Sequence, residues 1–335
     1  MDVNLGRKFP SIFLFILAVG LHSMVFSQTE TDSLSKELRR YVTRNFSEAR
    51  TFNLYWETGP SHSYTLKQNG RDIENGKIQT EQIVKFQTTI PIFLHKKFSL
   101  YVNGQANFYM FDVSNDSGGS MSSLFSNDEE SHQYYKAGIS GVYKTRFVTK
   151  PLIISTTISG DGWNKSFEKI HATLSAISIL KSSKSTTFGV GLYAMSLYNQ
   201  IPILPLIIYE HQFNPNLSVD VVLPNRAYLR YQFLNNHRLS IGATLESENF
   251  YLNPNLENVP KTSLYQRSRI KSKLVYEYII NNHFYITAQA GVAQIIKSGL
   301  YGTNRKGIDK GDPYVEYNQP MTPFFYFRFS YNLFK

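Results

Sequence analysis

The sequence predicts an all-β protein, folded as a transmembrane antiparallel up-and-down β-barrel of 14 strands. Three observations predict this fold: an export signal at the start, strand-length segments of alternating polarity, and connections that alternate between long and short. The same observations leave a barrel of 12 strands as an alternative. A soluble, exported β-sandwich is the remaining alternative fold.

The chain begins with the features of a secretory signal peptide. Arg7 and Lys8 precede an apolar run over residues 12–21, and compact residues precede Gln28. Such a run is too short to cross a bilayer, so we expect residues 1–27 to be a signal peptide that is removed before Gln28. No later apolar run is long enough for a membrane helix. The mature chain is therefore expected either to be soluble or to cross a membrane as strands.

The composition excludes several classes of protein. The 335 residues include no cysteine, which excludes disulfide-stapled domains and thiolate metal sites, and no cofactor is expected. An aromatic content of 15% with a mean hydropathy of −0.28 fits strands that have one apolar and one polar face. The net charge of +10 is spread over the chain. We therefore expect no nucleic acid as a partner, and instead outer-membrane lipid and small anionic solutes.

The mature chain divides into a polar periplasmic tail, residues 28–49, and a barrel over residues 50–335. In the clearest predicted strand, residues 98–112, apolar side chains occupy the even positions and mostly polar ones the odd positions. Similar alternation recurs in residues 239–246 and 284–292. A period of two places the two sets on opposite faces, one for lipid and one for water.

The last predicted strand, residues 323–335, has the same alternation and closes the barrel. Phe325 and Phe327 share its apolar face, whereas Tyr326 and Arg328 occupy the other. Its end is a candidate assembly signal for the barrel assembly machinery. The predicted signal residues are Phe329, Tyr331, Leu333 and Phe334.

The connections assign the two sides of the membrane. Counting back from the last strand, residues 298–320 and 251–262 are long connections, whereas residues 281–283 and 235–237 are short. Outer-membrane barrels have short periplasmic turns and longer outer loops, so the alternation predicts 14 strands in the outer membrane with both termini in the periplasm. Further outer loops are expected at residues 113–131 and 67–78.

The hairpin over residues 217–233 is the weakest part of this prediction, because its two strands have about seven residues each, fewer than a tilted spanning strand needs. If it lies outside the wall, the barrel has 12 strands. Within it, residues 221–233, VVLPNRAYLRYQF, resemble a motif of an uncharacterised outer-membrane β-barrel family of Bacteroidetes. The end of the signal peptide, Phe26-Ser27-Gln28, resembles those of the same group. The resemblance implies a barrel over nearly the whole mature chain and no established activity or site residue.

One predicted strand, residues 264–280, carries four cations on the face expected to line the lumen: Arg267, Arg269, Lys271 and Lys273. Four further cations share the predicted lumen face: Arg328, Arg230, Lys136 and Lys85. One interpretation is an anion-preferring pore, because charged rings select the permeating ion. The other is that the cations pair with carboxylates across the barrel, for which Glu246 and Asp220 are candidates.

The leading functional hypothesis is passive diffusion of small polar or anionic solutes through a cation-lined lumen, without enzymatic activity. The alternative is a closed structural barrel that presents loops 113–131 and 298–320 to a partner. Lumen filling separates them, and five tyrosines are expected to point inward: Tyr101, Tyr109, Tyr193, Tyr285 and Tyr326. A barrel lipase or deacylase is a minor alternative. His171 and Ser175 share a strand face, but roughly 13 Å separates them along the strand, too far for a hydrogen bond.

Overall fold

A computed structural model describes residues 50–115, 124–125, 131–183, 185–196, 203–254, 256–281, 283–304 and 312–333. All regular secondary structure in these ranges is β-strand. The described residues contain no helix that is long and apolar enough to cross a membrane. The strands are β1 (Phe52–Gly59), β2 (His62–Gln68), β3 (Arg71–Leu94), β4 (Phe98–Asn115), β5 (His132–Phe147), β6 (Lys150–Gly162), β7 (Phe167–Ser182), β8 (Thr186–Met195), β9 (Ile203–Gln212), β10 (Leu217–Leu223), β11 (Arg226–Phe233), β12 (His237–Leu252), β13 (Ser263–Ile280), β14 (Phe284–Gly302), β15 (Val315–Asn318) and β16 (Thr322–Tyr331).

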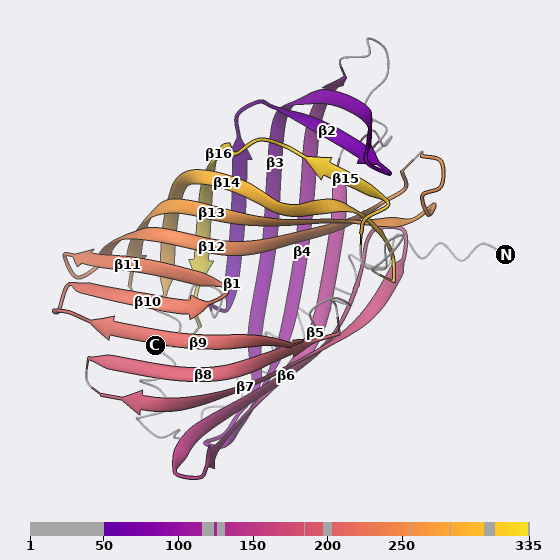
Figure 1. Cartoon of the computed structure of the whole chain (residues 1–335). Coiled ribbons are helices and arrows are strands. Elements are labelled where there is room, and N and C mark those ends of the chain that lie inside the picture. Colours follow the sequence, from indigo (N-terminus) through magenta and orange to yellow (C-terminus); the bar gives the residue numbers. More distant parts are fainter. Residues whose placement is uncertain are drawn as a thin grey trace.

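The strands close into an antiparallel barrel (Figure 1). From β3 to β14 each strand pairs with the next, β14 pairs with β16, and β1 closes the ring between β16 and β3. Of the sixteen strands in the sheet, β2 and β15 extend β1 and β16 beyond one end, which leaves the fourteen predicted wall strands. The short strands β10 and β11 pair in the wall between β9 and β12, so the alternative of 12 strands is wrong.

The two ends of the barrel differ. We call the end that carries β2 and β15 the distal end, and the opposite end proximal. Arg50, the first described residue, and Leu333, the last, lie together at the proximal end, where the Leu333 amide donates to Thr51 Oγ1 at 3.2 Å.

Two expected distal loops are largely strand. Residues 67–78 are not a loop, because β2 and β3 are joined by a tight turn at Asn69 and Gly70, which have φ angles of 53° and 75°. Such left-handed pairs form the two-residue turns that match strand twist. Within residues 298–320, β14 continues to Gly302 and β15 occupies Val315–Asn318.

An apolar belt surrounds the barrel. Exposed large apolar side chains point outward from most of the wall strands. They include Leu54, Ile139, Ile158, Leu174, Leu192, Ile207, Leu229, Ile241, Leu274, Val292 and Phe327. A water-soluble protein rarely exposes so large a continuous apolar surface, whereas a transmembrane barrel presents one to lipid.

Beyond the belt, the distal strands reverse their polarity. On distal β3 the side chains of Lys77 and Gln79 are exposed, whereas Ile78 between them is fully buried. A bulge follows between Ile78 and Thr80. Past it, Lys85 reaches the interior to bond Glu248, and its neighbour Val84 points outward. The distal strands therefore present polar side chains on the outer face and apolar side chains on the inner face.

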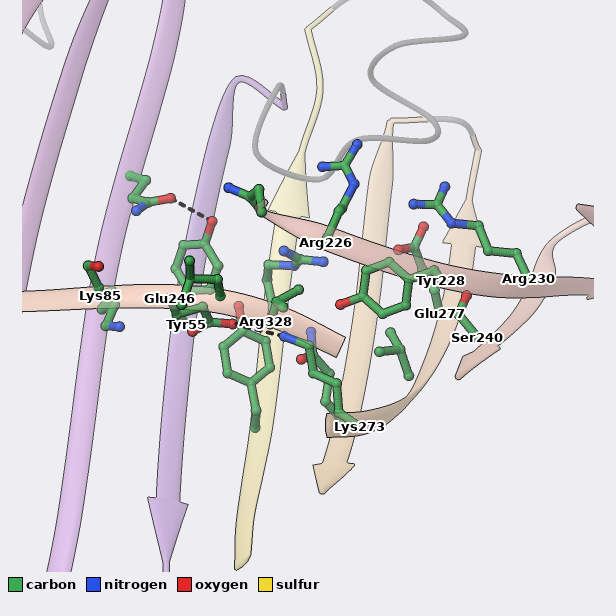
Figure 2. A pocket seen from close by; sticks show the side chains of 18 of the residues that line it. Tyr55, Lys85, Arg226, Tyr228, Arg230, Ser240, Glu246, Lys273, Glu277 and Arg328 are labelled. Atoms are coloured by element: carbon green, nitrogen blue, oxygen red, sulfur yellow. Dashed lines mark hydrogen bonds and ion pairs between the residues drawn. The ribbon is translucent and has the colours of Figure 1, made fainter. Parts of the chain in front are cut away.

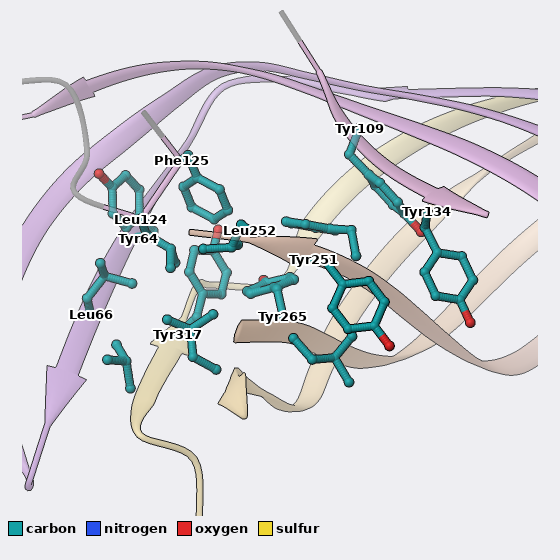
Figure 3. Close-up of a cluster of buried hydrophobic side chains, with 14 of the residues drawn as sticks. Tyr64, Leu66, Tyr109, Leu124, Phe125, Tyr134, Tyr251, Leu252, Tyr265 and Tyr317 are labelled. Atoms are coloured by element: carbon teal, nitrogen blue, oxygen red, sulfur yellow. The ribbon is translucent and has the colours of Figure 1, made fainter. Parts of the chain in front are cut away.

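The distal interior is an aromatic core formed by opposite walls of the barrel (Figure 3). The ring of Phe250 on β12 lies 4.7 Å from that of Tyr109 on β4, 4.9 Å from His132 on β5 and 4.7 Å from Tyr265 on β13. Tyr317 of β15 is buried in the same core, and burial raises the pKa of its hydroxyl well above its ordinary value. Strands β2–β5 and β12–β15 thus meet face to face and fill the distal end between them.

The short strands make this closure possible. β11 pairs with β12 only as far as Arg226 and Thr244, whereas β12 goes on pairing with β13 to Leu252. Figure 1 shows β10 and β11 ending partway along β12. Beyond Thr244, β12 has no neighbouring strand among the described residues on the β11 side, and this distal part of β12 packs against β5 across the barrel.

Candidate functional site

A cavity of about 600 Å³ lies in the lumen, on the proximal side of the aromatic core. Side chains from β1, β3, β11, β12, β13 and β16 converge on it (Figure 2). Its lining includes six cations, Lys85, Arg226, Arg230, Arg238, Lys273 and Arg328, and two carboxylates, Glu246 and Glu277. The lining therefore has an excess of positive charge.

Strand alternation explains how these side chains come together. Arg226, Tyr228 and Arg230 are alternate residues of β11, and all three line the cavity. Their neighbours Leu229 and Tyr231 are exposed on the outer surface. The period of two thus gives one face to lipid and the other to the lumen.

The four cations predicted on β13 are buried inside the barrel in a belt of ion pairs. The carboxylates of this belt come from β1, β3 and β12: Glu57, Glu81, Glu246 and Glu248. Arg267 bonds Glu81 and Glu248, and Arg269 lies 2.6 Å from Glu248. Such pairs need several partners, because burying a charge costs far more than burying a neutral group.

Two lysines complete the ion-pair belt. Lys271 Nζ lies 2.6 Å from Glu57 and 2.9 Å from Glu246, and Lys273 Nζ lies 2.9 Å from Glu246. Because β13 and β1 are separated by β14 and β16 in the wall, the bonds to Glu57 cross the interior. The belt forms the distal boundary of the cavity, directly below the aromatic core.

Glu57, Glu246 and Glu248 bring carboxylate oxygens within 4.8 Å of one another, as a cation site does. Each of them also accepts hydrogen bonds from two or more lysines or arginines of the belt. These cations occupy the place of a metal, so the cluster does not fit a metal site.

A second ion-pair group lies at the proximal end of the cavity. Glu277 accepts hydrogen bonds from Arg50 at 2.7 Å and from Arg238 at 2.8 Å. The guanidinium of Arg50 also lies 3.7 Å from the ring centroid of Tyr285. Arg50, from the chain just before β1, thereby links the start of the barrel to β13 and β14.

The distal turn of the β10–β11 hairpin borders the cavity. Arg226 Nε lies 3.1 Å from Asp220 Oδ2, and Arg230 lies 2.5 Å from the same oxygen. Glu210 on β9 is the cross-strand neighbour of Asp220. Counting these two carboxylates with the lining, cations still outnumber carboxylates six to four.

The other predicted lumen residues lie in different surroundings. Arg328 lines the cavity 5.6 Å from the ring centroid of Tyr55. Lys136 is half-buried on β5, opposite Gln105 of β4. Of the five predicted inward tyrosines, Tyr109 and Tyr285 are buried, Tyr326 lines the cavity, and Tyr101 and Tyr193 are half-buried.

The predicted assembly signal lies at the proximal end of β16. Phe329 is exposed in the apolar belt, and the ring of Tyr331 lies 4.8 Å from that of Phe284. Leu333 is half-buried, and Phe334 lies outside the described residues.

His171 does not meet Ser175. Its Nε2 lies 2.7 Å from Oδ2 of Asp161, and both side chains are fully buried. Tyr134 and Tyr251 donate hydrogen bonds to the same carboxylate at 2.8 and 2.9 Å. Asp161 was not singled out from the sequence, because its partners come from three other strands.

Comparison with known proteins gives a partial family match. Residues 150–306 match the family model described as a domain of unknown function, DUF6268. This range includes the VVLPNRAYLRYQF stretch, and the description names no group of organisms. No curated protein matches the chain.

Among solved structures, the chain is similar to the COG4313 outer membrane channel from Pseudomonas putida F1, with 11% identity and a TM-score of 0.37, covering 84% of this chain and 95% of that one. It is also similar to a Pseudomonas aeruginosa FadL homologue, with 9% identity and a TM-score of 0.40, covering 84% and 90%. The beta domain of the Bordetella autotransporter BrkA has 9% identity and a TM-score of 0.30, with coverage of 84% and 100%.

Proposed function

We propose that this protein is an outer-membrane barrel whose lumen binds organic anions during restricted passage across the membrane. The main support is the cavity of about 600 Å³, which is lined by six cations and two carboxylates. A cavity of this size suits a small organic molecule, and guanidinium groups recognise carboxylate and phosphate groups. The proposed orientation places both termini in the periplasm, supported by the position of Arg50 and Leu333 at one end.

Restricted passage is proposed instead of open diffusion because of the filling of the distal end. The aromatic core crosses the interior between β2–β5 and β12–β15. The ion-pair belt crosses it from β13 to β1 and β3. Tyr109, Phe250 and Arg267 are fully buried within this filling, which supports restricted passage on this side of the barrel. The proposal therefore makes the lumen a binding site first.

The second candidate is a closed interaction barrel without a solute, which the same filling supports. A hydrolase is less well supported, because His171 and Asp161 are fully buried beneath Tyr251 and Trp163. A nucleophile and its base must be reachable by substrate.

Equilibrium titration of the barrel in lipid nanodiscs separates the two candidates. Dansylglycine, an anion, is expected to bind about tenfold more tightly than dansylcadaverine, a cation that carries the same fluorophore. The double variant Arg226→Gln/Arg328→Gln is expected to weaken dansylglycine binding about tenfold, the equivalent of one charge-assisted hydrogen bond.

A matched control is Lys67→Gln/Lys77→Gln, which removes the same charge from the distal surface of β2 and β3. It is expected to leave both affinities unchanged. Equal affinity for the two probes, or no binding of either, would contradict the proposed function and favour the interaction barrel.

A further inference from the structure

The lumen has two chemically different walls, and the second one is apolar. Glu210 on β9 lies opposite Asp220, whose carboxylate bonds Arg230 in the lumen, so Glu210 faces the lumen as well. By alternation, the lumen-facing residues distal to Glu210 on β9 are Leu204, Leu206 and Ile208. All three are half-buried, and their outward neighbours Ile203 and Ile207 are exposed on the apolar belt. Strand β9 is thus apolar on both faces.

The apolar wall continues onto β8 and β7. Leu206 and Ile208 lie opposite Gly191 and Gly189 of β8. A side chain at either glycine would collide with Ile177 or Ile179 of β7, because a Cβ would lie 2.9 Å from Ile177 and 3.0 Å from Ile179. The two isoleucines therefore lie over the glycines and extend the apolar surface of β9 across β8.

Lumen-facing apolar side chains need an explanation, because the lumen face of a transmembrane barrel is ordinarily polar. The distal aromatic core does not supply one, since none of its described members comes from β7, β8 or β9. These side chains also stay half-buried, so the described residues leave part of their surface uncovered. Partly uncovered apolar surface that faces a lumen is typical of a binding site for an apolar group.

The apolar wall lies next to the cationic one. Ile208, Val222 and Arg226 are cross-strand neighbours on β9, β10 and β11. Two strand spacings, roughly 10 Å, separate Ile208 from Arg226 at this level. A molecule of moderate length can therefore contact both walls at once.

The cavity extends to the distal ends of the short strands β10 and β11. Asn225 and Arg226 of the β10–β11 turn line it, together with Leu245, the first residue of β12 beyond its pairing with β11. The cationic group thus lies beside the distal margin of the short strands, where Leu223 is exposed on the outer surface.

We propose, on the basis of the proposed function, that the ligand of this lumen is an amphiphilic organic anion. Its acidic group lies against Arg226 and the other cations of β11–β13, and its apolar part lies along Leu206, Ile208 and the isoleucines of β7. A small hydrophilic anion uses the cationic wall alone.

Two anionic probes with one fluorophore test this ligand class in nanodiscs, with binding to empty nanodiscs subtracted. We expect 11-(dansylamino)undecanoate to bind at least about tenfold more tightly than dansylglycine, because burial of two methylene groups already gives about that factor. The double variant Leu206→Asn/Ile208→Asn is expected to weaken binding of the long probe about tenfold and to leave dansylglycine unchanged.

The matched control Ser155→Asn/Ser175→Asn adds two asparagines to β6 and β7, opposite one another, without removing apolar surface. It is expected to bind both probes as the unmodified protein does. Two results would contradict the proposal that the ligand is amphiphilic while leaving the anion-binding function intact. These are equal affinity for both probes, and unchanged binding of the long probe to the variant with asparagines on β9. If neither probe binds, the proposed function itself fails.

Discussion

The distal and membrane-spanning parts of this barrel use the same strand alternation with opposite polarity. On β3, Lys77 faces water and Ile78 is buried in the aromatic core, whereas a few residues later Lys85 lies in the lumen. The surrounding medium explains the difference, because lipid accepts apolar side chains on the outside and leaves charge to the interior. In water the ordinary arrangement of a sheet sandwich returns, with its apolar faces packed together.

The two regions also close the lumen in different ways. In the distal part opposite walls meet directly through rings such as those of Phe250 and Tyr109. Closer to the proximal end they are linked across the interior by ion pairs such as Arg269 with Glu57. The first contact is apolar and excludes water. The second keeps charged groups next to the cavity.

The ion-pair belt is expected to give the largest effect on stability. Glu248 accepts hydrogen bonds from half-buried Lys85 and from buried Arg267 and Arg269, so Glu248→Ala leaves these three cations with fewer partners. We expect a loss of about 3–5 kcal/mol in the free energy of unfolding, measured by urea titration in lipid vesicles. The exposed carboxylate of β15, in Glu316→Ala, serves as the control and should change it by less than about 0.5 kcal/mol. Equal effects of both variants would mean that the belt is not a structural element.

A substitution in the distal aromatic core is expected to lower the free energy of unfolding by less than the loss of Glu248. Leu66 on β2 is fully buried there, and Leu66→Ala removes its side chain from packed surroundings. A loss of about 3 kcal/mol is expected from the cavity and the lost apolar contact. Ser63→Ala, on the exposed face of the same strand, should be nearly neutral in the same urea titration. A neutral Leu66→Ala would argue that the distal strands do not pack as described.

The smallest effect is expected at the polar contact between the two walls. Tyr251 on β12 and Tyr134 on β5 each donate one hydrogen bond to Asp161. Tyr251→Phe is expected to cost about 1 kcal/mol, because Asp161 keeps Tyr134 and His171. Tyr134→Phe should cost a similar amount in the same assay. A much larger cost for Tyr251→Phe alone would identify it as the main bond between the walls.

The membrane-spanning strands were predictable from the sequence because their alternation is regular. Parity along β13 correctly separates buried residues such as Arg267 and Lys271 from exposed Ile270 and Leu274. The alternation of long and short connections gave the number of wall strands, including the short hairpin of β10 and β11. These features depend on local pattern and on the medium alone.

The distal part was less predictable. The distal part of β3, residues 71–78, and the strand β15 were read as loops, although Asn69-Gly70 is a common hairpin signal. The bulge after Ile78 changes which positions of β3 face inward, and no local sequence pattern predicts this bulge. The contact of β12 with β5 depends on which walls close over the lumen, and sequence alternation carries no information on that.

The cavity was half predictable. Parity gave Arg230, Arg328 and the β13 cations, and Glu246 was considered as a partner. Glu57 and Glu81 lie on β1 and β3, far away in sequence, so their pairing needs the closed ring. The apolar lumen face of β9 is also hidden, because apolar residues at consecutive positions do not reveal which face they occupy.

The most direct test of the change in polarity uses one strand and one face. Ser268 and Leu274 both point outward from β13, roughly 20 Å apart, and the chain has no native cysteine to interfere. Nitroxide labels on Ser268→Cys and Leu274→Cys, in separate proteins reconstituted into lipid, report contact with a water-soluble nickel complex or with oxygen dissolved in lipid. We expect the label at position 268 to be relaxed mainly by nickel and the label at position 274 mainly by oxygen. Relaxation of both labels by nickel would contradict a barrel that spans the membrane below a distal sandwich in water.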